Sequence, residues 1–155
     1  MPEGLPSDAG CLVTGQACPL PRAILVVDDD PVFLRTMEAV LVRYGHRVSA
    51  WADPAAAMAA AEVAAPALLV TDLEMPGLDG FELFRRLCVR DPFLRGVLVS
   101  AHVSPERLVT IMESGIYDAV PKPLHDHHRL VEAVERQLHE ARRWRMLLRN
   151  LKGVG

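Results

Sequence analysis

The sequence of 155 residues predicts an α/β fold in which helices cover both faces of a five-stranded parallel sheet. Five short apolar runs alternate with segments in which apolar residues recur at helical spacing. Asp, Ser, Pro and Gly residues stand at the boundaries between these segments, where helices begin and end. The apolar content of 50% at this length fits one domain with some additional chain.

The first strand and the first helix are predicted within residues 23–45. Residues 23–27 (AILVV) form an apolar run that ends directly at three consecutive aspartates. The third of these, Asp30, is followed by Pro31, and this pair fits the N-cap and the first position of a helix. Gly45 follows the helical pattern, where a C-cap glycine is expected.

Residues 47–51 and 67–71 are predicted as the next two strands, with an alanine-rich helix between them. Asp53 and Pro54 fit the N-cap and the first residue of that helix, which extends to about residue 63. Asp72 directly follows the third strand. The next residues, LEMPGLDG, contain a Pro–Gly pair that is typical of a loop.

The second half of the chain continues the alternation. Asp79 with Glu82, and Ser104 with Pro105, are the start signals of two further helices. The predicted elements are a helix from residue 79 through residue 87, a strand at 96–100, a helix from residue 104 to near Gly115, a strand at 116–120 and a long final helix.

We expect three parts in the chain: a flexible tail at residues 1–21, a main domain at 22–138 and an extension of the last helix at 139–155. The three cysteines match neither a zinc spacing nor a disulfide framework. The first ten residues contain no Lys or Arg and lead into no sustained apolar core, which argues against a secretory signal. We therefore expect a cytoplasmic protein without a membrane segment.

Polar residues at the ends of four predicted strands can meet at one edge of the sheet, because parallel strands open their carboxyl ends on the same side. Asp28 and Asp29 follow the first strand, Asp72 the third and Lys122 the fifth, while Ser100 ends the fourth. Taken singly, Asp72 could be an ordinary loop residue, Ser100 a strand-end residue and Lys122 a surface residue. Neighbouring aspartates repel, and Mg²⁺ relieves the repulsion because it prefers carboxylate oxygens. Together, the set fits phosphoryl transfer to an aspartate, with a lysine and a hydroxyl contacting the phosphoryl oxygens.

Four motifs together resemble the receiver domain of two-component response regulators: VVDDDP, TDLEMPGLDG, VLVSA and a Lys–Pro pair after the fifth strand. The resemblance covers about residues 23–138 and implies a flavodoxin-like fold. It implies that Asp72 accepts a phosphoryl group from a sensor histidine kinase or a phosphotransfer protein. Asp28 and Asp29 match the acidic pair that binds Mg²⁺, with Asp29, Asp72 and the backbone carbonyl of Glu74 as direct ligands.

The resemblance also assigns the residues that contact and sense the phosphoryl group. Ser100 matches the hydroxyl switch residue, Ala101 the small residue beside it and Lys122 the phosphate-contacting lysine. The bond between Lys122 and Pro123 is often cis in this family, and the sequence offers an X-Pro bond at this place.

One position departs from the family. Receiver domains usually carry Tyr or Phe three residues before the lysine, and that ring moves inward when the hydroxyl residue moves. Here the position is Ala119, while Tyr117 lies two places earlier on the same side of the predicted strand. Phosphorylation should survive this change, because no ligand is lost, but signal output should differ.

The last helix allows two interpretations. Its apolar residues recur in steps of four and three, which is typical of a coiled-coil seam: Leu130, Val134, Gln137, Ala141, Trp144, Leu148 and Leu151. Alternatively, the first half packs on the sheet and the rest is a solvated extension, and both can hold. The five basic residues within 142–152 favour a helix C-terminus over a nucleic-acid contact, because no recognition motif accompanies them.

The main hypothesis is therefore a signalling module rather than an enzyme. A homodimer is possible, either through the last helix alone or through a face formed by the last helix together with the helix and strand at residues 104–120. A phosphatase resembling the haloacid dehalogenase superfamily would use Asp28 and Asp30, but it leaves the loop after Asp72 unexplained. A scaffold that is independent of phosphorylation is the other alternative. His125, His127 and His128 are expected to be solvated, because no matching metal ligands lie nearby in the sequence.

Overall fold

The computed structural model describes residues 22–114 and 116–153. The strands are β1 (Ile24–Val27), β2 (Val48–Trp51), β3 (Leu68–Thr71), β4 (Gly96–Ser100) and β5 (Ile116–Pro121). The helices are α1 (Pro31–Arg43), α2 (Pro54–Val63), α3 (Gly80–Arg90), α4 (Pro105–Glu113) and α5 (His127–Lys152). The predicted tail at 1–21 and the predicted helix end at Gly115 lie outside the described residues.

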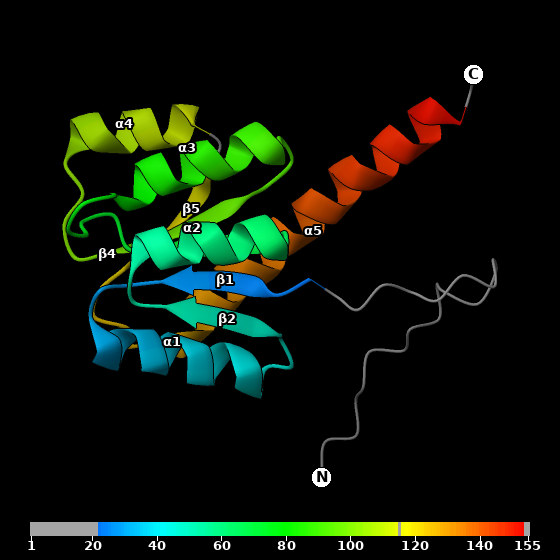
Figure 1. The fold of residues 1–155 in the computed structure, drawn as a ribbon. Helices are drawn as coiled ribbons and strands as arrows, with labels where there is room; N and C mark the ends of the chain where they lie inside the picture. The colour runs from blue at the N-terminus through cyan, green and yellow to red at the C-terminus, as the bar shows by residue number, and fades with distance from the viewer. Residues whose placement is uncertain (1–21, 115, 154–155) are drawn as a thin grey trace, which may run out of the picture.

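All strands pair in parallel in one sheet, in the order β2-β1-β3-β4-β5 (Figure 1). Each strand is followed by a helix, so the predicted flavodoxin-like α/β fold is confirmed. The order reverses between β1 and β3, because the chain moves from β1 outward to β2 and then back across to β3. In sheets of this kind, ligands bind where the strand order reverses, at the carboxyl ends of the strands.

The predicted N-caps begin their helices. Asp30, Asp53, Asp79 and Ser104 each accept a hydrogen bond from a backbone N–H in the first turn of the helix that follows. The first three strands begin one residue later than the apolar runs suggested, and β5 includes Pro121. The ends of apolar runs are weak boundaries, because helix and strand ends are set by hydrogen bonding.

Two hydrophobic layers enclose the sheet. On one face, buried residues of α1 and α5 pack on β1, β3, β4 and β5 in a cluster that includes Met37, Leu41, Leu130 and Val134. On the other face, α2, α3 and α4 pack through residues such as Ala57, Leu83, Phe84, Leu87 and Ile111. Buried apolar residues line both faces of the central strands, as expected for a parallel sheet with helices on each side.

The packing of α4 leaves most of its apolar residues exposed. Leu108, Val109 and Met112 follow the helical pattern in the sequence, yet all three are exposed, and Ile111 is the buried residue. Apolar spacing predicts a helix, but it does not determine which apolar stripe faces the core when the helix carries several apolar residues. An apolar surface is therefore present on α4.

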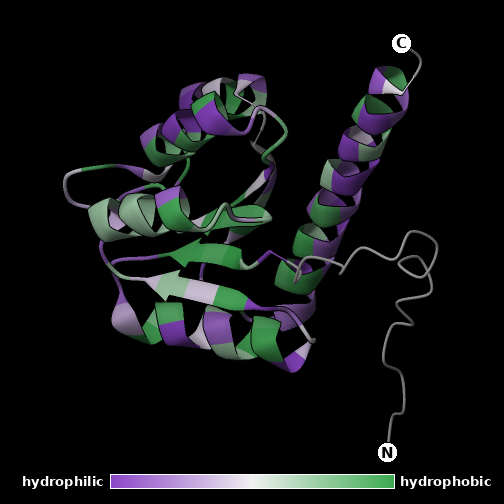
Figure 2. Ribbon diagram, turned by 45° about the vertical axis from the view of Figure 1, so that its right-hand side comes forward, coloured by the Kyte–Doolittle hydropathy of each residue, from purple (hydrophilic) through white to green (hydrophobic). Residues whose placement is uncertain are grey.

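The first half of the long helix α5 packs on the sheet and its end is exposed, while the coiled-coil seam stays a prediction. Its apolar positions are buried up to Ala141, whereas Trp144 and Leu151 are 46% and 77% exposed. The end of the helix projects away from the sheet with mixed polar and apolar residues (Figures 1 and 2). Arg145 donates to Asp91, the C-cap of α3, at 2.6 Å and ties the start of the projecting part to the domain. Among the described residues, no helix is long and apolar enough to cross a membrane.

Candidate functional site

The carboxyl edge of the sheet brings the predicted site residues together. Val27 of β1 pairs with Thr71 of β3, so the residues that follow them, Asp28 and Asp72, lie side by side. On the far side of β4, the backbone N–H of Lys122 donates to the carbonyl of Ser100 at 3.0 Å. The site therefore lies next to the position where the strand order reverses.

Three carboxylates form the acidic part of the site. Ligand oxygens of Asp28, Asp29 and Asp72 all lie within 4.8 Å of one another. Asp28 and Asp72 are buried, while Asp29 is exposed at the mouth of the site. The backbone N–H of Asp30 donates to Asp28 Oδ1 at 2.9 Å and holds that carboxylate in place.

Lys122 supplies the opposite charge. Its Nζ lies 2.7 Å from Asp28 Oδ2 and 3.1 Å from Asp72 Oδ2, and its side chain is 15% exposed. The ammonium also lies over the ring of Phe33, 4.3 Å from the ring centroid. The Lys122–Pro123 peptide bond is cis.

Burial and charge act in opposite directions on the groups of this site. Burial raises the pKa of Asp28 above its ordinary value, although hydrogen bonds from Lys122 and the backbone of Asp30 oppose it. Burial alone would lower the pKa of Lys122, but its hydrogen bonds to Asp28 and Asp72 outweigh this effect and raise it. Lys122 is thus a cation at neutral pH.

The donor set fits a hard divalent cation. Three carboxylates and one ammonium leave two formal negative charges that Lys122 does not balance. Clustered carboxylate oxygens are the ligands that Mg²⁺ prefers, and the exposure of Asp29 leaves the acidic group open to solvent. Glu74 is exposed in the loop two residues after Asp72, and its carbonyl remains a predicted ligand.

The hydroxyl of Ser100 is close to the site but has another partner. Ser100 is buried at the end of β4, and its Oγ donates to the carbonyl oxygen of His102 at 3.1 Å. Ala101, which follows it, is exposed. The hydroxyl would have to leave His102 before it could donate to a group on Asp72.

On β5, Ala119 is exposed at the position where a ring was expected from the resemblance. The side chain of Tyr117, its neighbour on the same strand, lies outside the described residues.

The three histidines near the start of α5, His125, His127 and His128, are exposed, as expected for solvated side chains. His128 Nδ1 lies 3.3 Å from the hydroxyl of Tyr44, and their rings meet edge to face. Within residues 22–114 and 116–153, the acidic group above is the one place where three or more metal-ligating side chains converge.

Two contributors to the site were not singled out from the sequence. Phe33 lies within the segment predicted as the first helix, and its ring lies under Lys122. Gly80 begins α3 so close to β3 that a Cβ there would overlap with the carbonyl oxygen of Asp72. The signal for Gly80 was its place directly after the helix cap Asp79; Phe33 had no local signal, because its partner is distant in the chain.

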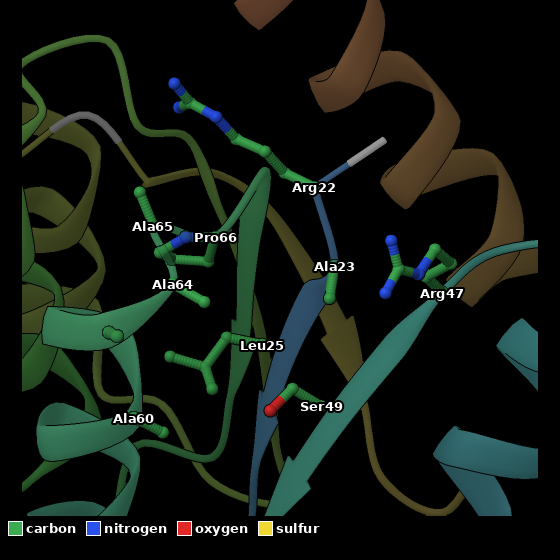
Figure 3. A pocket seen from close by; sticks show the side chains of 10 residues that line it. Arg22, Ala23, Leu25, Arg47, Ser49, Ala60, Ala64, Ala65 and Pro66 are labelled. Carbon is green, nitrogen blue, oxygen red and sulfur yellow. The ribbon is translucent and has the colours of Figure 1, made fainter. Parts of the chain in front are cut away.

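A hollow at the opposite edge of the sheet offers no comparable chemistry. Its volume is about 310 Å³, and it opens where small alanines of α2 face the starts of β1 and β2 (Figure 3). Arg22, Arg47 and Ser49 are its polar residues, and no carboxylate lines it. The acidic group at the carboxyl edge is therefore the stronger candidate.

Comparison with known proteins agrees with this geometry. The family profile described as "Response regulator receiver domain" matches residues 24–135. The chain is 32% identical over 130 residues to the C4-dicarboxylate transport transcriptional regulatory protein DctD of Rhizobium meliloti (strain 1021). The aligned segment covers 84% of this chain and 28% of DctD. It is 30% identical over 115 residues to the DNA-binding transcriptional regulator NtrC of Escherichia coli (strain K12), and this alignment covers 74% of this chain and 24% of NtrC.

Solved structures extend the comparison. NtrX from Brucella abortus in complex with ATP superposes with a TM-score of 0.75 at 31% identity, over 83% of this chain and 29% of NtrX. A CheY-like receiver domain protein from Methanospirillum hungatei JF-1 gives a TM-score of 0.73 at 25% identity, over 79% of this chain and 98% of that one. The chain spans about a quarter of the length of the curated relatives DctD and NtrC. The fold, the matched profile and these relatives show that the chain belongs to the receiver domains of two-component response regulators.

Proposed function

We propose that Asp72 accepts a phosphoryl group in a reaction that requires Mg²⁺, and that the modified domain presents a changed surface to a protein partner. The carrying observation is the contact of Asp72 with Lys122 at 3.1 Å inside a group of three carboxylates. A carboxylate next to a fixed ammonium and a divalent-cation site is suited to attack phosphorus, because phosphoryl transfer is catalysed mainly by positioning and charge neutralisation.

In the proposed reaction, an oxygen of Asp72 forms a bond to phosphorus while the bond from phosphorus to the donor atom breaks, and the donor keeps the electron pair. The donor would be a histidine of a sensor kinase or a phosphotransfer protein. Asp28, Asp29 and Asp72 would hold Mg²⁺, with the Glu74 carbonyl as a further ligand. The ion would neutralise charge on the phosphoryl oxygens. Lys122 would move from Asp72 to a phosphoryl oxygen, while its contact with Asp28 keeps the ammonium in the site.

The readout would begin at Ser100. Its hydroxyl would exchange the His102 carbonyl for a phosphoryl oxygen, which is a stronger acceptor because it is charged. Ala119 offers no ring to follow this movement, so the change would reach the surface through the backbone between β4 and α4. The exposed apolar side chains of α4 lie in that path and would be the surface that a partner detects.

A homodimer is the partner arrangement that we consider first. The projecting part of α5 presents Trp144, Met146, Leu147 and Leu151 as exposed apolar residues. A second copy could cover them in a coiled coil, or it could dock on the face formed by α4, β5 and α5. A sensor kinase would be the transient partner at the acidic site.

Intact mass spectrometry after incubation with acetyl phosphate and Mg²⁺ tests the proposal directly. We expect the mass of one added phosphoryl group in the wild type and none in Asp72→Asn. Asp126→Asn is the matched control, because Asp126 only caps α5 and Asn caps equally well. Size-exclusion chromatography of the same samples reports whether phosphorylation changes the oligomeric state.

Two outcomes would favour the alternatives. An unmodified wild type that still binds Mg²⁺ would indicate a scaffold that does not use phosphorylation. Turnover of a generic phosphate ester that requires Asp28 but not Asp72 would indicate a phosphatase.

A further inference from the structure

The aromatic ring beside the phosphate-contacting lysine is the feature that the proposed reaction leaves unexplained. Phe33 lies in the first turn of α1, half-buried against the core between the sheet and α5. Lys122 Nζ is 4.3 Å from the centroid of the Phe33 ring. This distance is well inside the range in which the negative face of an aromatic ring attracts a cation.

The backbone of Phe33 is tied to the acidic part of the site. Asp30 caps α1 by accepting from the backbone N–H groups of Val32 at 3.0 Å and Phe33 at 3.4 Å. The backbone N–H of Asp30 in turn donates to the carboxylate of Asp28. A short chain of hydrogen bonds therefore fixes the first turn of α1, and with it the ring, relative to the carboxylates that Lys122 contacts.

A lysine ammonium depends on neighbouring groups to hold it in place more than an arginine guanidinium does. Its side chain has four rotatable carbon–carbon bonds, and its ammonium is a compact charge that water solvates strongly. In this site the two carboxylates bind the ammonium on one side, and the ring lies against it on another. The ring restricts both the rotamers of Lys122 and the access of water to its charge.

We propose that Phe33 is a positioning residue that keeps the Lys122 ammonium in place while the charge on Asp72 changes. This inference deepens the proposed function and rests on it. When Asp72 becomes an acyl phosphate, the ion pair between Lys122 and Asp72 is replaced, whereas the attraction to a neutral ring is unchanged. Together with the Asp28 contact, Phe33 thus supplies a contact to Lys122 that does not depend on the phosphorylation state of Asp72, and it keeps the ammonium within reach of the phosphoryl oxygen.

The rate of phosphorylation by acetyl phosphate at saturating Mg²⁺, followed by intact mass, tests this role. Phe33→Leu keeps an apolar side chain but removes the ring, and we expect the rate to fall about two- to tenfold. Phe33→Tyr restores a ring and should recover most of the rate. In a Lys122→Met background, Phe33→Leu should have no further effect, because the residue on which it acts is absent.

A matched control separates positioning from packing. Val48 is a partly buried residue that packs against the same core cluster from β2, and Val48→Ala should lower stability without lowering the rate. A second readout needs neither Mg²⁺ nor phosphoryl donor: the ε-methylene protons of Lys122 should show an upfield ring-current shift in NMR spectra that is lost in Phe33→Leu.

The outcomes are distinguishable. A wild type that is not phosphorylated overturns the proposed function itself. A wild type that reacts while Phe33→Leu reacts at the same rate overturns this inference alone. The inference also fails if Phe33→Leu slows the Lys122→Met variant by the same factor as the wild type, because Phe33 would then act through packing, or if the ring-current shift is missing.

Discussion

The close approach of α3 to β3 makes the substitution Gly80→Ala a sharp test of the site geometry. A Cβ at residue 80 would overlap with the carbonyl oxygen of Asp72 and would lie 2.8 Å from Oγ1 and 2.9 Å from Cγ2 of Thr71. The same carbonyl oxygen accepts a hydrogen bond from Thr71 Oγ1 at 2.8 Å. The nearest atom is backbone, and Thr71 is a buried β-branched residue with little rotational freedom, so the backbone of Asp72 or the start of α3 must move.

The expected size follows from two opposing effects. Overpacking of a buried contact destabilises the fold by about 1–3 kcal/mol, while Ala in place of Gly in a helix stabilises it by up to about 1 kcal/mol. We therefore expect Gly80→Ala to lower the free energy of unfolding by about 1–2 kcal/mol, which corresponds to a Tm lower by roughly 2–8 °C for a domain of this size. Because a shift of the Asp72 backbone would also move its carboxylate, the proposed nucleophile, the rate of phosphorylation should fall at least about tenfold.

Gly153→Ala is the matched control. Gly153 has a φ of −84° at the end of α5, and its nearest atoms would lie 3.6 Å and 3.7 Å from an added Cβ. This variant should leave both Tm and rate close to the wild-type values. Thermal unfolding by circular dichroism and the acetyl phosphate time course measure the two quantities. A Gly80→Ala protein with wild-type Tm and rate would refute the reasoning that α3 constrains the position of Asp72.

Three further predictions follow from other parts of the structure. Burial alone would raise the pKa of Asp118, but hydrogen bonds from Arg136 and Gln137 of α5 outweigh burial and lower the pKa. The ionised carboxylate therefore stabilises the fold above about pH 4, and this contribution is lost on further acidification. Asp118→Asn should cost about 1 kcal/mol near neutral pH in urea titrations, and the difference from wild type should shrink below pH 4. Burial, with a smaller effect of the Asp91 carboxylate, raises the pKa of Cys88 to about 11. In a Cys11→Ser, Cys18→Ser background, iodoacetamide at pH 8 should therefore label Cys88 slowly until urea unfolds the protein. Mg²⁺ at about 100 times its Kd should stabilise the protein by about 2.7 kcal/mol in thermal unfolding, and Asp29→Asn should remove most of this effect.

Each of these has a clear counter-result. A pH-independent difference between wild type and Asp118→Asn would mean that hydrogen bonding to the ionised carboxylate is not what stabilises the contact. Rapid labelling of Cys88 without urea would contradict the raised pKa of its thiol. Equal stabilisation of wild type and Asp29→Asn by Mg²⁺ would place the ion outside the acidic group.

Much of the fold could be predicted from local patterns. The apolar runs and the caps at Asp30, Asp53, Asp79 and Ser104 locate all ten elements, because caps and strand-length runs are encoded within a few residues. The parallel sheet follows from the alternation of elements. The meeting of Asp28, Asp72 and Lys122 follows in turn, since parallel strands end on the same edge.

Contacts that depend on packing could not be predicted in this way. Phe33 and Lys122 are distant in the sequence, and nothing near either residue indicates that the ring lies under the ammonium. The same limit applies to α4, where Ile111 rather than its apolar neighbours faces the core. The partner of the Ser100 hydroxyl depends on the path of the loop after β4, which no local pattern specifies.

The ion pair between Lys122 and Asp28 joins residues that are 94 positions apart, almost the full span from β1 to the end of β5. Asp28 is completely buried in the folded domain. If Asp28 were buried before β5 docks, its carboxylate would lack the Lys122 counter-charge, which is strongly unfavourable. Partly assembled forms that lack the last strand are therefore disfavoured, and during synthesis the acidic edge can close only after the C-terminal elements emerge. The proposed phosphoryl transfer to Asp72 would thereby depend on the docking of β5.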